Sequence, residues 1–195
     1  MISPSKNSFA AVVLCGGQSR RMGSDKAFLP YQGQALYKNQ LDFLRRFGPA
    51  QVMLSGRRGV AYPDAAEIVL DAPGSNGPVA GLAAALENCR HPHLLVLAVD
   101  MPKASSDLIE ALLAHRQPGC GVIPFIGENP EPLLALYPKE AFSLTEKQLQ
   151  QNRLRARDFA HACEQSGLAE RFICAEAEQP HFENWNQPSD VEPLD

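Results

Sequence analysis

The chain has 195 residues, of which 45% are hydrophobic and 21% charged, and its formal net charge is -4. This length suits one domain with a substantial core, and the composition is typical of a globular protein. Lys and Arg total 18 against 22 Asp and Glu, so general binding of nucleic acid, which needs a broad basic surface, is not expected. A small anionic ligand held by a few local cations is compatible with this charge.

The apolar segments and the cysteines favour a cytoplasmic protein. The first apolar run, Phe9–Cys15, is short, lacks a small-residue cleavage site and leads directly into a glycine-rich segment. No window approaches the roughly 20 apolar residues that span a bilayer, so no membrane segment is expected. The five cysteines are scattered without a CxxC pair, which favours reduced, mostly buried thiols.

Short apolar runs alternate along the first half with segments of helical periodicity. Strands are expected at Phe9–Cys15, Val52–Ser55, Glu67–Asp71 and His93–Val99. Helices are expected at Gln34–Arg46, Val79–Cys89 and Ser105–His115. The run His93–Val99 is almost continuously apolar, as in a central parallel strand that is buried on both faces. This alternation predicts a parallel sheet covered by helices on both sides.

The second half has a less regular pattern. Strands are expected at Gly121–Ile126, Leu133–Tyr137 and Arg171–Ala175. Helices are expected at Lys139–Gln151 and Leu154–Ser166. No internal repeat or low-complexity linker divides the chain.

A glycine-rich segment, Leu14–Lys26, begins where the first strand should end. Open α/β sheets bind ligands beyond the carboxyl ends of their strands. The adjacent Gly16 and Gly17 allow several backbone N–H groups to face one anion. Three cations follow within seven positions: Arg20, Arg21 and Lys26. Neither the Walker pattern nor GxGxxG fits the segment. The combination of a strand end, two adjacent glycines and three cations nevertheless favours phosphate binding over a solvated basic turn.

This segment resembles the signature loop of the nucleotidyltransferases that activate sugars, polyols and molybdopterin, and in particular that of the molybdenum cofactor guanylyltransferases. The resemblance covers most of the chain and is loose from Lys139 to Glu178. It implies a Rossmann-like three-layer α/β sandwich with a mostly parallel central sheet. It also implies a single nucleotidyltransferase domain over residues 1–195, with the nucleotide in the N-terminal half and the pterin in the C-terminal half.

The resemblance assigns nucleotide contacts to the end of the first strand and to the loop. The residues expected around the nucleotide are Leu14, Cys15, Gly16, Gly17 and Lys26. Lys26 would meet the phosphates, and Lys26 and Arg21 would act in catalysis by neutralising charge on the leaving group. Ser55 is also a candidate nucleotide contact, although the guanylyltransferases often have Asn there and a hydroxyl keeps only one of the amide's hydrogen bonds.

Two aspartates are predicted at strand ends. Asp100 follows the most buried strand, where a carboxylate is costly without a cation or donors. Mg²⁺ can be held by one carboxylate together with waters and substrate phosphates, and the family has a metal-binding Asp here, so Asp100 is predicted to be a catalytic residue and the Mg²⁺ ligand. Asp71 could accept hydrogen bonds from the base or the ribose. The alternative for both is a turn-forming role.

The end of the chain carries Asn184 and Asn186, which resemble a closing Asn-x-Asn-x-Pro element of the family. On a strand the two amides would face the same way and meet one ligand, which the resemblance implies to be the pterin. An Asn-rich turn is the alternative. Glu131 and Leu133 stand where the family has His and Thr, so the resemblance assigns no pterin contact to either side chain.

These residues predict transfer of GMP from GTP to the terminal phosphate of molybdenum-molybdopterin, with Mg²⁺ as cofactor and pyrophosphate as the second product. The resemblance also implies transient contact with molybdoenzyme maturation proteins. Use of CTP is the nearest alternative: the Cys15-Gly16-Gly17 loop favours GTP, whereas Met101-Pro102 points weakly to CTP. A sugar-phosphate nucleotidyltransferase and a non-catalytic nucleotide-binding adaptor are further alternatives, the adaptor being opposed by the intact Lys26 and Asp100.

Overall fold

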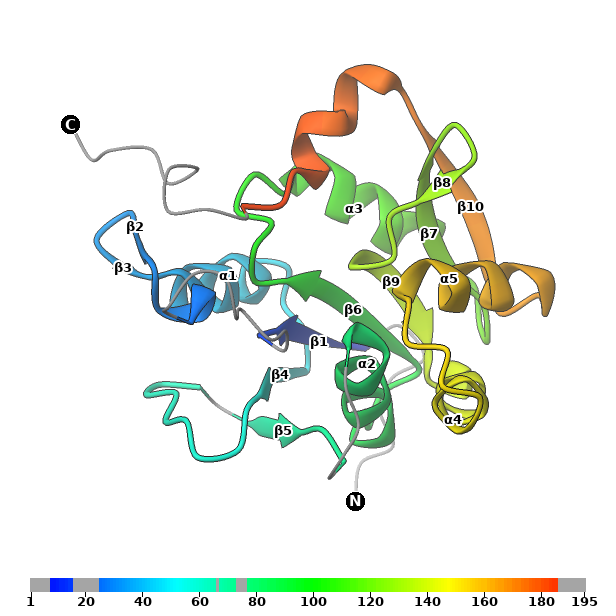
Figure 1. Cartoon of the computed structure of the whole chain (residues 1–195). Coiled ribbons are helices and arrows are strands. Elements are labelled where there is room, and N and C mark those ends of the chain that lie inside the picture. The colour runs from blue at the N-terminus through cyan, green and yellow to red at the C-terminus, as the bar shows by residue number, and fades with distance from the viewer. Residues whose placement is uncertain (1–7, 16–24, 66, 73–76, 186–195) are drawn as a thin grey trace.

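The computed structural model describes residues 8–15, 25–65, 67–72 and 77–185, and within them eight strands form one sheet (Figure 1). The strand order is β10-β7-β9-β6-β1-β4-β5, with β8 paired to β7. The strands are β1 (Phe9–Leu14), β4 (Gln51–Gly56), β5 (Ile68–Leu70), β6 (His93–Ala98), β7 (Gly121–Ile126), β8 (Asn129–Pro130), β9 (Leu134–Pro138) and β10 (Ala169–Cys174). A separate two-stranded ribbon pairs β2 (Pro30–Tyr31) with β3 (Gln34–Ala35).

Helices cover both faces of the sheet, which confirms the predicted three-layer α/β architecture. The α-helices are α1 (Leu36–Arg45), α2 (Pro78–Glu87), α3 (Ser106–His115), α4 (Phe142–Gln150) and α5 (Ala156–Gln165). On one face, α1 and α3 pack against the sheet, and on the other α2, α4 and α5 lie together. Short 3₁₀ helices η1 (Lys26–Phe28), η2 (Lys139–Ala141) and η3 (Glu176–Phe182) complete the described elements.

The central strands divide their side chains between two apolar cores because alternate residues of a strand face opposite sides. In β1, Ala11 and Val13 join the core under α1 and α3, whereas Ala10 and Val12 join the core under α2 and α5. All six residues of β6 are buried. The near-continuous apolar run of His93–Val99 therefore correctly indicated a strand covered on both faces.

The sheet is mostly parallel, as predicted, with β9 inserted in the opposite direction. The strands β4, β1 and β6 pair in parallel, as do β5 with β4 and β10 with β7. Strand β9 pairs antiparallel with both β6 and β7. The start of β9 consequently lies beside the end of β6, and the backbone N–H of Ala98 donates to the carbonyl of Leu133 at 2.8 Å.

Three expected helices begin later than predicted. Gln34 and Ala35 pair with β2, so α1 starts only at Leu36. The segment expected as a helix from Lys139 opens with η2 and becomes α-helical at Phe142. The helix expected from Leu154 starts at Ala156. Helix α3 matches its prediction, because the Ser105 side chain caps it by accepting from the backbone N–H of Leu108.

Helix α2 begins with two residues that suit the start of a helix. Gly77 has φ 81°, a backbone conformation that favours glycine, and Pro78 occupies the first turn, where the missing N–H has no partner to lose. Across the part of the chain that the structure describes, every helix is too short or too polar to traverse a lipid bilayer.

Candidate active site

The register of the parallel strands brings the predicted strand-end residues to one edge of the sheet. Leu14, the last residue of β1, is opposite Ser55 of β4 on one side and Ala98 of β6 on the other. Asp71 follows β5 directly, and Asp100 follows β6 by two residues. Residues far apart in the sequence are thus neighbours because parallel strands end at the same edge.

Lys26 and Asp100 contact each other at this edge. The Nζ atom of Lys26 lies 3.1 Å from Oδ2 of Asp100, and the two side chains are only 17% and 23% exposed. The sequence predicted both residues as functional but did not predict that they would meet. In a partly shielded site, each charge offsets the cost of withdrawing the other from water.

The backbone around Asp100 is held from two sides. The buried Gln40 side chain donates from Nε2 to the carbonyl oxygens of Val99, at 3.3 Å, and Met101, at 2.8 Å. The backbone N–H of Trp185 donates to the carbonyl of Asp100 at 2.8 Å. The indole of Trp185 in turn packs edge-on against Tyr31. Asp100 therefore sits on a fixed turn rather than on a free loop.

Ser55 and Asp71 form a second polar pair at the edge. Ser55 is fully buried, and its Oγ donates to Oδ1 of Asp71 at 3.5 Å. Burial raises the pKa of Asp71, and the hydrogen bond from Ser55 partly opposes this shift. A methyl group added to Gly81 of α2 would lie 2.9 Å from Ser55 Oγ. Gly81 thus lets α2 approach the strand ends, an architectural role that the sequence left open.

Cys15 lies in the same group but is unsuited to nucleophilic chemistry. Its backbone N–H donates to the carbonyl of Ser55 at 3.0 Å, and the residue is buried. Burial, reinforced by the negative charges of Asp25 and Asp100, raises the pKa of the thiol far above its usual range, against the opposing effect of Arg57. The thiol stays protonated, so its contribution is shape and backbone hydrogen bonding.

Sequence reasoning missed an ion pair between Asp25 and Arg57. Arg57, directly after β4, contacts the Asp25 carboxylate, whose other oxygen accepts from the backbone N–H of Ala27 at 3.2 Å and caps η1. The pair fixes the start of η1, and with it Lys26, against the end of β4. The available signal was an arginine immediately after a predicted strand, in Ser55-Gly56-Arg57.

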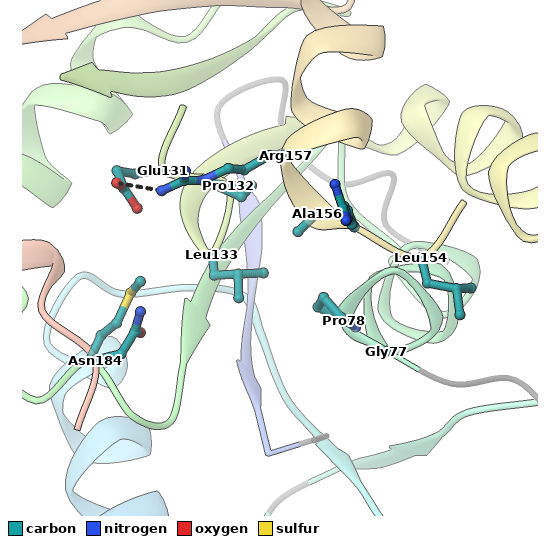
Figure 2. Close-up of a pocket in the computed structure, with 11 residues that line it drawn as sticks. Gly77, Pro78, Glu131, Pro132, Leu133, Leu154, Ala156, Arg157 and Asn184 are labelled. Carbon is teal, nitrogen blue, oxygen red and sulfur yellow. Dashed lines mark ion pairs between the residues drawn. The ribbon is translucent and has the colours of Figure 1, made fainter. Parts of the chain in front are cut away.

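A pocket of about 460 Å³ adjoins the strand ends (Figure 2). It is lined by Gly77, Pro78, Met101, Glu131, Pro132, Leu133, Leu154, Arg155, Ala156, Arg157 and Asn184. The antiparallel insertion of β9 supplies its wall at 131–133, and the start of α5 supplies its cations. The volume is within the range of small-molecule sites, which are concave and mostly apolar with a few polar groups.

The predicted site residues fall into three groups. Leu14, Cys15, Lys26, Ser55, Asp71 and Asp100 gather at the strand ends, and Asn184 lines the adjoining pocket. Gly16, Gly17, Arg21 and Asn186 lie outside the described residues. The sequence did not single out Arg57, Arg155 or Arg157. Within the described part of the chain, no three or more His, Cys, Asp or Glu side chains gather as a metal cluster.

Known proteins show similarity over nearly the whole chain. A family model for the MobA-like NTP transferase domain matches residues 11–166. A relative from Opitutus terrae, described as a probable molybdenum cofactor guanylyltransferase, is 32% identical over 193 residues, which cover 97% of this chain and 96% of the relative. A molybdenum cofactor guanylyltransferase from Xanthomonas euvesicatoria is 41% identical over 113 residues, covering 57% of each chain.

Solved structures show the same fold. Molybdopterin-guanine dinucleotide biosynthesis protein A from Archaeoglobus fulgidus aligns with a TM-score of 0.69 at 25% identity, over 94% of this chain and 95% of that one. The 2-C-methyl-D-erythritol 4-phosphate cytidylyltransferase from Thermus thermophilus aligns with a TM-score of 0.67 at 19% identity, over 94% and 95%. The second likeness concerns the fold alone.

Proposed function

The chain belongs to the MobA-like NTP transferase domain family, and from this premise we propose that it transfers GMP from GTP to the terminal phosphate of molybdenum-molybdopterin. The products would be the guanine dinucleotide form of the cofactor and pyrophosphate. The observation that carries the proposal is the Lys26–Asp100 pair, 3.1 Å apart at the strand ends, beside a pocket that contains Asn184. The names of the relatives from Opitutus terrae and Xanthomonas euvesicatoria support the choice of substrates.

Asp100 fits a role as the protein's ligand to Mg²⁺. It is a partly exposed carboxylate at a strand end, and it already faces a cation, Lys26. Mg²⁺ is commonly held by one or two carboxylates, with the remaining positions taken by waters and substrate phosphates, so a cluster of protein ligands is not required. When bound, the ion would stabilise negative charge on the reacting phosphates.

The chain's own residues would position two anions that repel each other. Lys26 would contact the triphosphate and stabilise the charge that accumulates on the departing pyrophosphate. Arg21 is proposed for the same task. Gly16 and Gly17 would offer backbone N–H groups to the phosphates. An ionised phosphate nucleophile has little need of a base, and the protonated thiol of Cys15 argues against a covalent intermediate at this residue.

The nucleoside would lie toward β4 and β5, and the pterin in the pocket. Leu14, Ser55 and Asp71 offer an apolar contact, a hydroxyl and a carboxylate at the ends of their strands. Asn184, with Asn186 proposed beside it, would serve the pterin. We thus propose one nucleotidyltransferase domain over residues 1–195 with the nucleotide in its N-terminal half and the pterin in its C-terminal half. Transient contact with molybdoenzyme maturation proteins stays a prediction.

Release of pyrophosphate tests the proposal. We expect release only when Mg²⁺, GTP and molybdopterin are all present, and loss of the signal when any one is omitted. GTP should act at least about tenfold better than CTP, a difference of about 1.4 kcal/mol. Equal or better turnover with CTP would make the protein a cytidylyltransferase. Nucleotide binding without any release would make it an adaptor.

A further inference from the structure

The pocket contains a carboxylate, Glu131, that has no part in the phosphate chemistry proposed above. Glu131 lies between β8 and β9, and its backbone N–H donates to the carbonyl of Pro124 at 2.9 Å, which fixes the residue on the sheet. Its side chain is 16% exposed and lines the pocket. Burial raises the pKa of this carboxyl, and the charge of Arg157 partly opposes the shift. Withdrawing such a carboxylate from water costs free energy unless a ligand provides it with a partner.

Arg157 satisfies Glu131 only in part. The distance from Nη2 of Arg157 to Oε1 of Glu131 is 3.8 Å, longer than a hydrogen bond of about 2.7–3.2 Å, and the Arg157 side chain is 59% exposed. Among the residues that the structure describes, none donates a hydrogen bond to either carboxylate oxygen of Glu131. An ionised carboxylate can accept several, so both oxygens have capacity left for a ligand.

The walls around Glu131 suit a flat heterocycle. Figure 2 shows Glu131 and Asn184 on one side of the pocket, Pro78 and Leu154 on the other, and Leu133 between them. The lining is mostly apolar with a few polar groups, an arrangement in which the polar groups fix the orientation of a ligand. The two acceptor oxygens of Glu131 suit a ligand with two adjacent N–H donors.

We infer that Glu131 is the specificity-determining residue for the ring of the second substrate, and that it accepts hydrogen bonds from the 2-amino group and the adjacent ring N–H of a pterin. The inference rests on the proposed function, because that function makes a pterin the second substrate. Two adjacent donors of the pterin meet two acceptors of the carboxylate, and such charge-assisted pairs are the stronger hydrogen bonds. A ring with a carbonyl in place of the 2-amino group would direct an acceptor at an acceptor.

The inference is tested by combining the variant Glu131→Gln with a ligand in which a carbonyl replaces the 2-amino group. We compare the affinities for 6-carboxypterin and for 6-carboxylumazine, which has the 2-carbonyl, by fluorescence titration. The wild-type protein should prefer the pterin by about tenfold or more, since a site built for a donor rejects an analogue that lacks it. Glu131→Gln offers one donor and one acceptor, the complement of lumazine, so its preference should fall at least about tenfold and move toward lumazine.

Two matched variants exclude a nonspecific effect of the substitution and a role of Glu131 limited to holding Arg157. Glu128→Gln makes the same substitution three residues earlier, at a side chain that is 86% exposed, pairs with Arg171 and does not line the pocket. It should leave both affinities unchanged. Arg157→Gln removes the ion partner but not the acceptors, so it should retain the preference for pterin. If Glu131 served only to hold Arg157, then Glu131→Gln and Arg157→Gln would act alike on both ligands.

The outcomes separate this inference from the proposed function. Pyrophosphate release with molybdopterin, combined with an unchanged pterin-to-lumazine ratio in folded Glu131→Gln, would overturn the inference alone. A shifted ratio without any release would overturn the proposed reaction but leave recognition of the ring supported. Failure of the wild-type protein to bind 6-carboxypterin, or equal affinity for the two rings, would also overturn the inference.

Discussion

Asp100 and Lys26 stand 74 positions apart in the chain and 3.1 Å apart in the structure. In the absence of substrate, the two charges neutralise each other at a site shielded by the surrounding strands. Under the proposed function, a triphosphate with its cation would offer each residue a partner of opposite charge. The ion pair would thus keep both groups at the strand ends until a substrate replaced it, at a modest cost because neither side chain is fully buried.

Asp100→Asn should fold normally and lose most Mg²⁺-dependent turnover. The amide has the shape of the carboxylate but cannot neutralise a dication, and removal of one strong transition-state stabiliser costs about a hundredfold. Steady-state pyrophosphate release measures the loss, and Asp42→Asn, an exposed partner of Arg45, is the matched control. A near-normal rate in folded Asp100→Asn protein would remove Asp100 from the metal role.

The ionised side chain of Asp71 should lower the free energy of unfolding at neutral pH. Its pKa is raised in the folded state, so the folded protein binds the proton more tightly than the unfolded chain does. The resulting loss in free energy of unfolding is absent below the unfolded pKa of about 3.9 and grows as the pH rises toward the folded pKa. Above the folded pKa the loss has its full size. Asp71→Asn should therefore melt at a higher temperature than the wild type at pH 7, and the gap should close near pH 4.

Glu67 supplies a control of opposite sign for this experiment. Burial raises its pKa, but hydrogen bonds from Arg90 and Gln51 outweigh that effect and leave the pKa lowered. Its contribution to stability is present above its unfolded pKa and is lost as pH falls through the folded value. Glu67→Gln should thus melt below the wild type at pH 7. The same sign of change in both variants would contradict the assignment.

At the scale of elements, the contact between α2 and β4 depends on Gly81. Alanine normally stabilises a helix interior relative to glycine by about 0.5–1 kcal/mol. Here the added methyl would lie 2.9 Å from Ser55 Oγ, so that hydroxyl must shift and weaken its hydrogen bond to Asp71. We expect Gly81→Ala to lower the free energy of unfolding by about 1 kcal/mol, in the range of overpacked cores.

Removal of the Ser55 hydroxyl should reverse the sign of that effect. In a Ser55→Ala background, Gly81→Ala meets no close oxygen and should stabilise the protein through helix propensity. Denaturant unfolding of the two single variants and the double variant gives the coupling between the sites. If the changes in free energy of unfolding were strictly additive, a methyl group at position 81 would not interact with the Ser55 hydroxyl.

Local patterns predicted the elements because local chemistry determines them. Ser105 caps α3, and the unbroken apolar run of β6 reports burial on both faces. Gln34 and Ala35 were expected in α1 but pair with β2 in a short local hairpin, which overrides helical periodicity at these two positions. The boundaries of η2 and α4 differ for a similar local reason, because the first turn after Pro138 is 3₁₀.

At the scale of the whole molecule, the sequence predicted some residues of the candidate site but not the pocket beside them. Asp71 and Asp100 could be predicted, since each follows an apolar run at a place where parallel strands end together. The pocket could not, because its wall at Glu131 arises from the antiparallel insertion of β9 beside β6. Strand order is a long-range property that short motifs do not encode, and the same holds for the Asp25–Arg57 contact.

The proposed assignment of the nucleotide and the pterin to different halves of the site predicts opposite effects of two variants. Lys26→Ala should weaken GTP binding and leave pterin binding nearly intact. Joint replacement of Asn184 and Asn186 by Ala should raise KM for molybdopterin by about tenfold or more, since each lost hydrogen bond contributes about 1 kcal/mol, with little effect on GTP. Calorimetric titration of each folded variant with each ligand checks this. Loss of GTP affinity in the asparagine variant, with pterin affinity retained, would refute the division.

The central claim is that a GMP unit moves from GTP to a molybdopterin phosphate, and isotopic labelling follows that unit directly. We predict that label on the α-phosphorus of GTP appears in a product that also contains the pterin, whereas label on the γ-phosphorus leaves in pyrophosphate. Recovery of the α label only as unreacted GTP or free GMP, with purified protein, Mg²⁺ and molybdopterin present, would contradict the claim.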